Sequence, residues 1–595
     1  MELLLLLLQR HGELVSREEI HAYLWGKDVF LDVDHGINTA IRKVRFALHD
    51  DPDKPRFIET VVGKGYRFAA PVTCRNGDSS QRLAALQQIP DSATRPAKPG
   101  AVSIRARMLV AGSVTLALIV VTWALYRGSQ HKSAGQPAIR SLAVLPLKNL
   151  SGDPMQEYLA DGMTEDLVGR LSRIHDLRVI SRTSVMRFKT TQLSVPEIAK
   201  ALHVDAIVEG SIIREGSRVR VHAQLIRAST DEHFWSESYD RELQDVLTLQ
   251  SDVAQSIASK VEVTVTGKEH ERLSAVRSVS PEVYESYLKG EFSKGDSKAD
   301  VEKRIGYFEA AINKDPTFAP AYLGLAEAYS DLGAIFVGGR PDETRPKVIS
   351  AAQKALDLDP NLAEAHALLA EVYQERWRWA DAEAEYRRAL ELNPNDVAAH
   401  LGFAHWLLCQ GRTEEALAWS RRAQQLDPLG VTGVSNGWIL FHARRYDEAM
   451  RELRSVLAVH PDYATARWFL GFVLIGSGRS QEAIPLLEKT ALMMKRSPGS
   501  IELLATAYAR AGQRTRALRL IDELRRRRQA GYVPAGAFIN PYLGLGDYDQ
   551  AFFWMEQAYQ EQSNILQFLR VHPFFDPVRS DPRFADLERR VGLAQ

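Results

Sequence analysis

The chain has 595 residues, of which 45% are hydrophobic and 25% are charged, with 75 Lys and Arg against 75 Asp and Glu. This length predicts several domains, and the ordinary composition excludes a wholly disordered, collagen-like or wholly membranous protein. The zero net charge excludes a uniformly basic nucleic-acid binder but not a local basic surface. Two cysteines are too few for a disulfide framework or a cysteine-rich zinc site.

The first predicted domain covers residues 1–73 and consists of short helices followed by a hairpin. Residues 3–13 predict a helix, and Ser16 can cap a second helix that runs to about Trp25. A third helix is expected over residues 35–48. Its apolar side chains recur at three- and four-residue steps and predict a buried stripe of Ile37, Ile41, Val44 and Leu48.

The opposite face of the third helix is polar and basic, and it carries Asn38, Thr39, Arg42, Lys43 and Arg45. A major groove admits one helix, whose Arg and Lys side chains can reach phosphates and guanine edges. Residues 57–68 predict two strands around Gly63-Lys64-Gly65, a hairpin that can lay a lysine into a minor groove. The alternative is a solvated basic face on a structural domain, but the order of these elements favours DNA binding.

These elements resemble the OmpR/PhoB-type winged-helix domain, in the membrane-bound variety of ToxR- and CadC-like regulators. The resemblance rests on residues 14–20, 24–25, 37–52 and 57–68. It implies that residues 38–48 form the recognition helix, and that Lys64 contacts DNA from the wing with support from Arg67. The implied major-groove contacts are Asn38, Thr39, Arg42, Lys43 and Arg45. The family's N-terminal sheet is missing, so either the true start lies upstream or the domain is clipped.

Two segments follow that carry no globular pattern. Residues 74–107 are rich in Pro, Ser and Ala and predict a flexible linker. Residues 108–126 carry no charge and would span about 28 Å as a helix, close to the ~30 Å hydrocarbon core of a bilayer. A buried core helix is the alternative, but we expect a transmembrane helix. The DNA-binding pattern and a weak excess of basic residues before the span predict a cytoplasmic N-terminus.

Residues 138–266 predict a small α/β domain. Strands are expected at 139–147 and 177–181, a hairpin around Glu215-Gly216, and helices at 160–174, 195–204 and 246–261. The segments 143–153, 160–167, 208–211 and 234–243 resemble the TolB N-terminal-like domain, a fold to which we attach no activity.

No catalytic, cofactor or metal site is expected in the chain. Asp161, Glu165 and Asp166 lie near a helix start, where carboxylates suit the helix dipole better than a metal. The histidines His366, His400, His405 and His442 are expected in the core or groove of helices. The sequence shows neither a phosphate-binding loop nor a nucleophile elbow.

Residues 281–560 contain a repeat. Alanines recur at steps of 33 or 34 residues, at Ala382, Ala416, Ala449, Ala483, Ala517 and Ala551. The pattern resembles about eight tetratricopeptide repeats, whose solenoid offers a concave surface to a protein or peptide. Residues 561–595 are expected to form the terminal cap.

The sequence therefore predicts a multidomain, mostly α protein with a winged helix-turn-helix, one transmembrane helix, a small α/β domain and a repeat solenoid. We expect a transcription regulator of the bacterial inner membrane, with a single span, a cytoplasmic N-terminus and a periplasmic C-terminal region. Its partners would be double-stranded DNA, the membrane, a protein or peptide on the repeat groove, and a second copy on DNA. The alternative is an envelope scaffold of tetratricopeptide repeats whose clipped winged helix no longer binds DNA.

Overall fold

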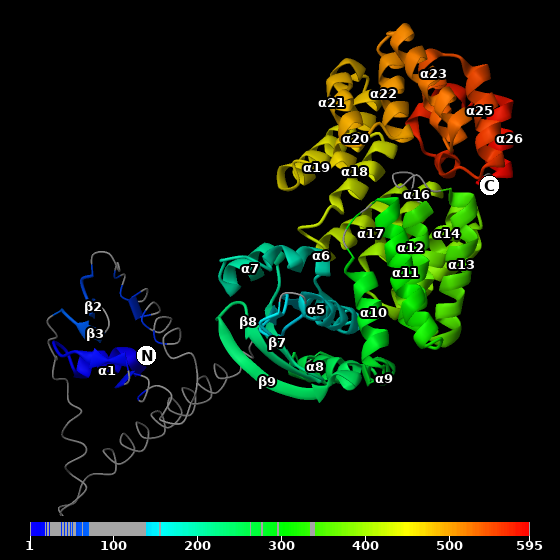
Figure 1. Ribbon diagram of the computed structural model, residues 1–595. Coiled ribbons are helices and arrows are strands. Elements are labelled where there is room, and N and C mark those ends of the chain that lie inside the picture. Colours follow the sequence, from blue (N-terminus) through cyan, green and yellow to red (C-terminus); the bar gives the residue numbers. More distant parts are fainter. Residues whose placement is uncertain are drawn as a thin grey trace, which may run out of the picture. The chain divides into compact units, whose positions relative to one another are not determined.

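The computed structural model describes two compact units, residues 1–127 and 128–595, and each is described by itself (Figure 1). The described residues are 2–17, 19–20, 23, 37, 41, 44–45, 48, 50, 55–61, 64–70, 138–153, 156–261, 263–274, 278–293, 295, 297–333 and 340–593.

The N-terminal unit combines a helix with a three-stranded antiparallel sheet. Helix α1 spans Glu2–Gln9, and the strands β1 (Val15–Ser16), β2 (Ile58–Val61) and β3 (Gly65–Phe68) lie in the order β1-β3-β2. Helix α1 is shorter than expected because Gly12 adopts a left-handed backbone, φ +82°, and its N–H donates to the Phe68 carbonyl at 3.0 Å. Strand β1 was not expected.

The core of this unit joins α1, the sheet and the third predicted helix. The expected stripe is confirmed at its described positions, since Ile37, Ile41 and Val44 are buried and Leu48 is partly buried. They pack with apolar residues of α1 and the sheet, which include Leu3, Leu7, Val15, Ile58, Tyr66 and Phe68. The hydrophobic pattern of the sequence therefore located this core.

The C-terminal unit begins with a six-stranded mixed sheet. Its strands are β4 (Ser141–Val144), β5 (Lys148–Asn149), β6 (Arg178–Val179), β7 (Ala206–Glu215), β8 (Arg218–Arg227) and β9 (Glu232–Glu242). The order is β6-β4-β7-β8-β9, with β5 pairing β7, and the pairs made by β4 and β5 are parallel. The expected hairpin is present, with Gly216 at φ +62° between β7 and β8. Strand β9 was missed by the sequence analysis.

Helices pack against both faces of this sheet. The expected helices lie at α5 (Glu157–Leu171), α7 (Val195–Leu202) and α8 (Val246–Lys260), and α6 (Arg182–Val185) is an addition. Alternate residues of β4 face opposite sides: Leu142 and Val144 join the core under α5 and α8, whereas Ala143 joins the cluster with α6 and α7. Helix α9 (Gly267–Ser274) leads toward the repeats.

Antiparallel helix pairs then form a solenoid (Figure 1). The helices are α10 (Pro281–Glu291), α11 (Lys298–Lys314), α12 (Ala319–Gly333), α13 (Pro341–Leu358), α14 (Ala363–Glu375), α15 (Trp379–Leu392), α16 (Val397–Cys409), α17 (Thr413–Leu426), α18 (Gly433–His442), α19 (Tyr446–Val459), α20 (Ala464–Gly476), α21 (Ser480–Met493), α22 (Pro498–Arg510), α23 (Arg514–Ala530), α24 (Ile539–Leu545) and α25 (Tyr548–Gln560). Small residues let helices approach closely. A Cβ on Gly402 would lie 2.4 Å from the ring of Tyr386.

The C-terminal segment folds back onto earlier repeats. The short helix η5 (Ala535–Phe538) precedes α24, and η6 (Asn564–Phe568), η7 (Pro573–Val578) and α26 (Pro582–Arg590) follow α25. Gln374 of α14 donates to Gln567 at 2.9 Å, Trp379 of α15 donates to the Val591 carbonyl at 2.8 Å, and Arg444 makes a two-pronged ion pair with Asp576. This segment was expected only as a cap, but it contacts repeats about 200 residues earlier.

Polar contacts join the α/β domain to the repeats within this unit. The Asn395 amide donates to the carbonyls of Ser172 and Leu177, each at 2.8 Å. The hydroxyls of Ser181 and Ser184 both donate to the buried Asp427 carboxylate at 2.6 Å. These contacts make the sheet domain and the solenoid one compact unit.

The expected membrane topology is corrected. Among the described residues, no helix is both long and apolar enough to cross a membrane. Helix α13, with 18 residues, carries charged side chains on the face opposite its buried alanines, as the amphipathic helices of a solenoid do. The expected span, residues 108–126, lies outside the described residues. The finding overturns the fold class with a transmembrane helix and the single-pass inner-membrane location with a periplasmic C-terminal region.

Candidate nucleic-acid interface and repeat cavity

The wing of the N-terminal unit is the hairpin of β2 and β3. Its strands pair from Ile58↔Phe68 to Val61↔Gly65, and the Lys64 N–H closes the turn on the Val61 carbonyl at 3.0 Å. The Lys64 side chain is exposed at this turn. An exposed lysine at a hairpin tip is accessible to DNA. The wing contact expected of Lys64 stays a prediction.

Arg45 links the third helix to the base of the wing. Its guanidinium donates to the Ile58 carbonyl and to the Thr60 hydroxyl, each at 2.9 Å, and lies 3.9 Å from Asp50. Only 14% of its side chain is exposed. In the structure these contacts position Arg45 at the base of the wing, and the major-groove contact that the resemblance implies for Arg45 stays a prediction.

Asp50 fixes the start of β2 and was missed by the sequence analysis. Its wholly buried carboxylate accepts from the backbone N–H groups of Arg56, Phe57 and Ile58 at 2.6–3.0 Å. Burial by itself would raise the pKa of Asp50, but these three donors and Arg45 outweigh it, and the pKa is lowered. The sequence alone does not single out Asp50, because Asp51 and Asp53 lie in the same segment between the third helix and β2.

The remaining predicted wing residue, Arg67, forms an ion pair with Glu59 on the neighbouring strand at 3.2 Å. The Ser16 cap is confirmed, since its hydroxyl accepts from the Glu19 N–H at 3.2 Å and the Glu19 carboxylate accepts from the Ser16 N–H at 2.9 Å. The predicted major-groove residues Asn38, Thr39, Arg42 and Lys43 lie outside the described residues.

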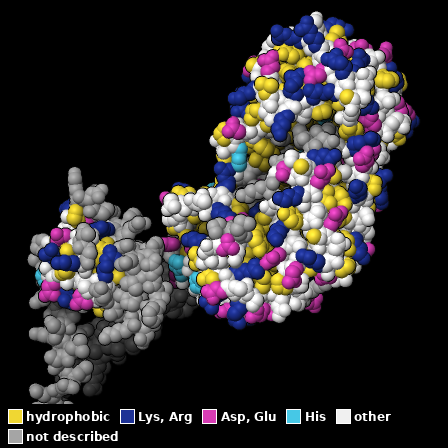
Figure 2. Space-filling model, viewed as in Figure 1, with side chains coloured by type: hydrophobic (Ala, Val, Ile, Leu, Met, Phe, Trp, Pro, Cys, Tyr) yellow, Lys and Arg dark blue, Asp and Glu magenta, His cyan; other side chains and the backbone are white. Residues whose placement is uncertain are grey.

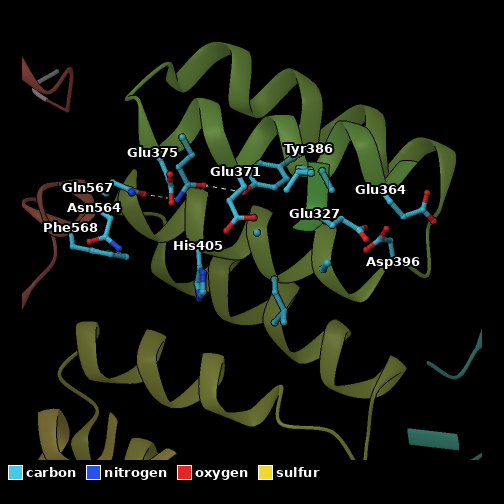
Figure 3. A pocket seen from close by; sticks show the side chains of 16 residues that line it. Glu327, Glu364, Glu371, Glu375, Tyr386, Asp396, His405, Asn564, Gln567 and Phe568 are labelled. Carbon is cyan, nitrogen blue, oxygen red and sulfur yellow. Dashed lines mark hydrogen bonds between the residues drawn. The ribbon is translucent and has the colours of Figure 1, made fainter. Parts of the chain in front are cut away.

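A cavity of about 500 Å³ lies on the inner side of the first repeats (Figure 3). Five carboxylates line it, together with Tyr386, His405 and residues of the returning C-terminal segment. Figure 3 shows Glu327, Glu364 and Asp396 near one another at one end, and Glu371 and Glu375 toward the other. Asn564, Gln567 and Phe568 form the wall opposite α14. The cavity is therefore acidic and is built from segments far apart in the chain.

The surrounding protein raises the pKa of several of these carboxyl groups. Loss of water is the largest cause for each, and neighbouring carboxylates add to it. The pKa of Glu327 rises to about 8, with Glu364, Glu165 and Asp331 raising it and Arg304 lowering it. The pKa of Glu371 rises to about 7 beside Glu375 and Asp331, and that of Asp396 rises to about 7. Ionising all of these carboxyl groups at once is therefore unfavourable in the cavity.

Two further cavities adjoin the first through shared lining residues. One of about 180 Å³ shares Glu371, Glu375 and Asn564 with it. The next, of about 730 Å³, shares Arg345 and Tyr532 with the second. It is lined by four arginines, which are Arg340, Arg345, Arg376 and Arg528. Because they share lining residues, the three cavities lie next to one another, and we refer to this row as the groove. Carboxylates line its first cavity, and arginines line its last.

Other candidate residues take structural roles. Asp161 pairs with Lys189, Glu165 pairs with Arg182, and Asp166 accepts from the buried Tyr284 hydroxyl at 3.0 Å. The ring nitrogens of His400 and His442 bond to backbone carbonyls one turn earlier. Within the part of the chain that the structure describes, no group of three or more histidine, cysteine or acidic residues could hold a metal ion.

Four family models match parts of the chain. Residues 1–68 match the model described as transcriptional regulatory protein, C terminal, and residues 138–259 match the second domain of HilA/YgeH-like transcriptional regulators. Residues 363–396 and 440–498 match tetratricopeptide-repeat models. The OmpR/PhoB-type domain and the repeats are thus supported. The α/β domain is similar to a domain of a transcriptional regulator, and the expected TolB-like resemblance is not shown.

Some of the curated relatives are named as transcription regulators, and one is named as a putative cyclase. A protein named putative adenylate cyclase 3, from Rhizobium meliloti, is 33% identical over 42% of this chain and 42% of its own length. The regulator RpaA of Synechocystis is 46% identical over 11% of this chain and 27% of its own. The cholera toxin transcriptional activator of Vibrio cholerae is 29% identical over 17% of this chain and 35% of its own. The chain spans less than half the length of these relatives.

Parts of this chain are similar to solved structures. The human IFIT1 dimer with PPP-AAAA is 14% identical and covers 58% of this chain and 78% of its own, with a TM-score of 0.37. The tetratricopeptide protein YrrB, described as having an unusual peptide-binding site, is 19% identical over 33% of this chain and 95% of its own, with a TM-score of 0.23. The family models support a transcription regulator with a DNA-binding domain and a tetratricopeptide region.

Proposed function

We propose that this protein binds double-stranded DNA through its N-terminal winged helix, and that its C-terminal unit couples a protein or peptide partner to that binding. The observation that carries the proposal is the wing, because its exposed Lys64 lies at the turn of a hairpin whose base is fixed to the third helix by Arg45. A rigid wing next to a basic helix gives one surface for two grooves.

The proposed contacts follow the resemblance to the winged-helix family. Asn38, Thr39, Arg42 and Lys43 would face the major groove, and Lys64 would face the minor groove or a phosphate. Arg67 would support Lys64 from β3, the strand that follows the turn. Arg45 holds the wing through the Ile58 carbonyl and the Thr60 hydroxyl. Only a small surface has to be basic, which agrees with the mixed charges over the face in Figure 2.

Two copies are proposed to act together on DNA. A single winged helix reads one half-site, and paired half-sites place recognition helices about one DNA turn apart. Pairing through the C-terminal units raises the local concentration of the second winged helix and strengthens binding without new DNA contacts. The regulator is preferred over a cyclase because the matched family models describe regulator domains and repeats.

Chromatin immunoprecipitation with sequencing tests this function in cells. The proposal predicts discrete binding sites upstream of genes, with transcripts that change when the chain is deleted. The matched comparison is a chain with Arg42→Ala and Lys43→Ala, which should lose these sites at equal abundance. Sites that persist in this variant, or a pattern without discrete sites in the unaltered chain, would contradict DNA binding by the winged helix.

A further inference from the structure

The acidic end of the groove lacks the positive charge needed to balance it. Glu375 pairs with Arg345 at 2.7 Å, and Asp396 accepts from the Ala399 N–H at 2.9 Å as the cap of α16. Within the described residues, no Lys, Arg or His lies within ion-pair distance of Glu327, Glu364 or Glu371. Glu327 lies on α12, and Glu364 and Glu371 lie on α14. Figure 3 shows Glu327 and Glu364 toward one end of the cavity and Glu371 toward the other.

One atom of this end is also left without a partner. Oε2 of Glu364 is wholly buried and accepts no hydrogen bond from the described residues. A buried carboxylate oxygen without a donor costs about 1–3 kcal/mol, and more when it is charged. A donor from outside the chain would remove that cost. This orphaned oxygen is an observation independent of the clustering of charges.

The groove is open and has room for more than an ion. The acidic cavity holds about 500 Å³, and its floor and walls include Ala367, Leu368, Ala398, Leu401 and Phe568 beside the carboxylates. Apolar walls suit the methylene stem of a lysine or arginine, whose charged end reaches the carboxylates. The adjoining cavities extend this hollow toward the arginines, so the groove suits an extended segment rather than a small cation.

The arginine-rich end has more positive than negative side chains. Arg340 pairs with Asp342 at 2.9 Å, and Arg528 pairs with Glu561. The exposed guanidinium of Arg376 makes no ion pair with any described residue, and Asp342 and Glu561 are the acidic side chains that line this cavity against four arginines. An acidic side chain or a terminal carboxylate is the complement of this end.

From this charge pattern we infer that the groove binds an extended peptide segment of a protein partner. The peptide places lysine or arginine side chains beside Glu327 and Glu364 and beside Glu371, and an acidic group at the arginines. The inference deepens the proposed function, because it names the chemistry of the partner that the C-terminal unit would couple to DNA. The returning segment, residues 561–568, forms one wall of the groove and so makes the site depend on the closed solenoid.

Fluorescence anisotropy tests peptide binding to the groove. It uses the full chain and labelled peptides that have a basic half and an acidic half. The probes are Gly-Lys-Gly-Lys-Gly-Ser-Gly-Glu-Gly-Glu, the same residues in reverse order, and both sequences with glutamine in place of lysine. At least one lysine-containing peptide should bind at low ionic strength, and loss of its lysines should weaken binding about tenfold or more. Spermidine, which lacks the acidic group, should compete poorly.

Variants of the protein distinguish binding in the groove from non-specific attraction between opposite charges. Glu327→Gln with Glu371→Gln should weaken binding about tenfold or more, and Arg376→Gln should weaken it by a smaller factor. The matched control is Glu302→Gln with Glu391→Gln, which removes the same charge from exposed outer positions and should leave binding within about twofold. The amide variants keep the side-chain shape and remove repulsion, so circular dichroism should show an unchanged fold.

Three outcomes would overturn the inference. The first is that neither lysine-containing peptide binds at millimolar concentration. The second is equal loss in the groove pair and the control pair. The third is tight binding of spermidine with no preference for the peptides. Without peptide, the groove variants should bind DNA with the affinity of the unaltered chain. A chain that binds the peptide but not DNA would contradict the proposed function and would leave the inference about the groove standing.

Discussion

At the scale of single residues, Arg45 shows how a basic side chain on the proposed recognition helix can serve structure. Arg45→Ala removes two hydrogen bonds from a charged donor and leaves the buried Asp50 without its nearest cation. The expected loss of local stability is about 2 kcal/mol. Hydrogen–deuterium exchange of the segment 55–70 in the full chain measures it, and Arg45→Ala should exchange much faster than the unaltered protein.

Lys64→Ala is the matched comparison for Arg45→Ala. Its exposed side chain makes no ion pair with a described residue, so exchange of the same segment should stay the same, within about 0.5 kcal/mol. Its effect should instead appear in DNA binding as a slope of affinity against salt that is smaller by about one. Equal exchange in the two variants would show that Arg45 does not hold the wing.

Gly65 is a position where the backbone allows only glycine. Its φ is +153°, and a Cβ there would lie 2.1 Å from the Val15 carbonyl oxygen of β1. Gly65→Ala should therefore separate β1 from β3 and cost about 2–4 kcal/mol. Exchange of the Val15 and Ser16 amides reports this pairing, and protection equal to that of the unaltered chain would refute the close approach. Gly216→Ala in the other unit, where nothing lies within 4 Å, controls for left-handed strain alone.

Sequence reasoning succeeded and failed for identifiable reasons at this scale. The buried stripe of Ile37, Ile41 and Val44 was predictable because helical periodicity is local. The role of Arg45 was not predictable, because its partners Ile58 and Thr60 are supplied by a strand that only the fold brings close. The exposed Lys64 was predictable from the glycines that flank it. The carboxylate Asp50 could not be distinguished from neighbouring loop acids without the backbone donors it receives.

At the scale of elements, the repeats were predictable from the 34-residue period, whereas what closes them was not. Small residues such as Ala382 and Ala389 mark helix crossings within each pair. The contact between Gln374 and Gln567 joins elements 193 residues apart, and no period in the sequence indicates it. Strand β9 was missed because its side chains are mostly polar and exposed, which hides the alternation that identifies a strand.

The junction between the α/β domain and the solenoid depends on Asp427. Asp427→Ala removes the acceptor for the Ser181 and Ser184 hydroxyls, each at 2.6 Å, and should weaken the junction by about 2–3 kcal/mol. Calorimetry of the full chain should then show the α/β domain unfolding at a lower temperature than the repeats. Asp462→Ala, at an exposed loop position, should leave the transition unchanged. A single unaltered transition in Asp427→Ala would show that the junction is held elsewhere.

The acidic cavity predicts how stability depends on pH. The pKa of Glu327 is raised to about 8 and that of Glu371 to about 7, so the folded state binds more protons than the unfolded state between about pH 4.5 and 8. Stability from these groups is complete below about 4.5 and is lost as the pH rises through 7 and 8. Buried histidines act oppositely, because burial lowers the pKa of His405 to about 4 and they destabilise the fold as the pH falls below about 6.5.

The contribution of the two carboxyl groups is the difference in free energy of unfolding between the unaltered chain and a variant that lacks them. Urea unfolding of the unaltered chain and of Glu327→Gln with Glu371→Gln should differ little at pH 5, and the variant should become the more stable one as the pH approaches 8. The histidine contribution is the same in both and cancels. A difference that is constant across this range would show that neither carboxyl group retains its proton in the folded chain.

At the scale of the whole molecule, the DNA-binding pattern and the repeat array lie in two separate compact units. The sequence identified a regulator domain and a repeat array, and the family models support both. The membrane span was the main error, since it was expected from the apolar stretch 108–126 and its flanks, whereas no described helix could cross a membrane. The C-terminal unit brings together the α/β domain, the closed solenoid and the charged groove, so a partner on the groove contacts a single compact body.

The central claim is that the N-terminal unit binds specific DNA sequences, and one measurement tests it most directly. The full chain is used to select duplexes from a random library, and its affinity for the enriched duplex is compared with that for unselected DNA. The account predicts enrichment of paired half-sites and an affinity at least about a thousandfold above non-specific binding. Arg42→Ala with Lys43→Ala should lose most of this difference, while Lys148→Ala with Lys260→Ala should keep it. A library that shows no enrichment, or equal affinity of both pairs of variants, would contradict the account.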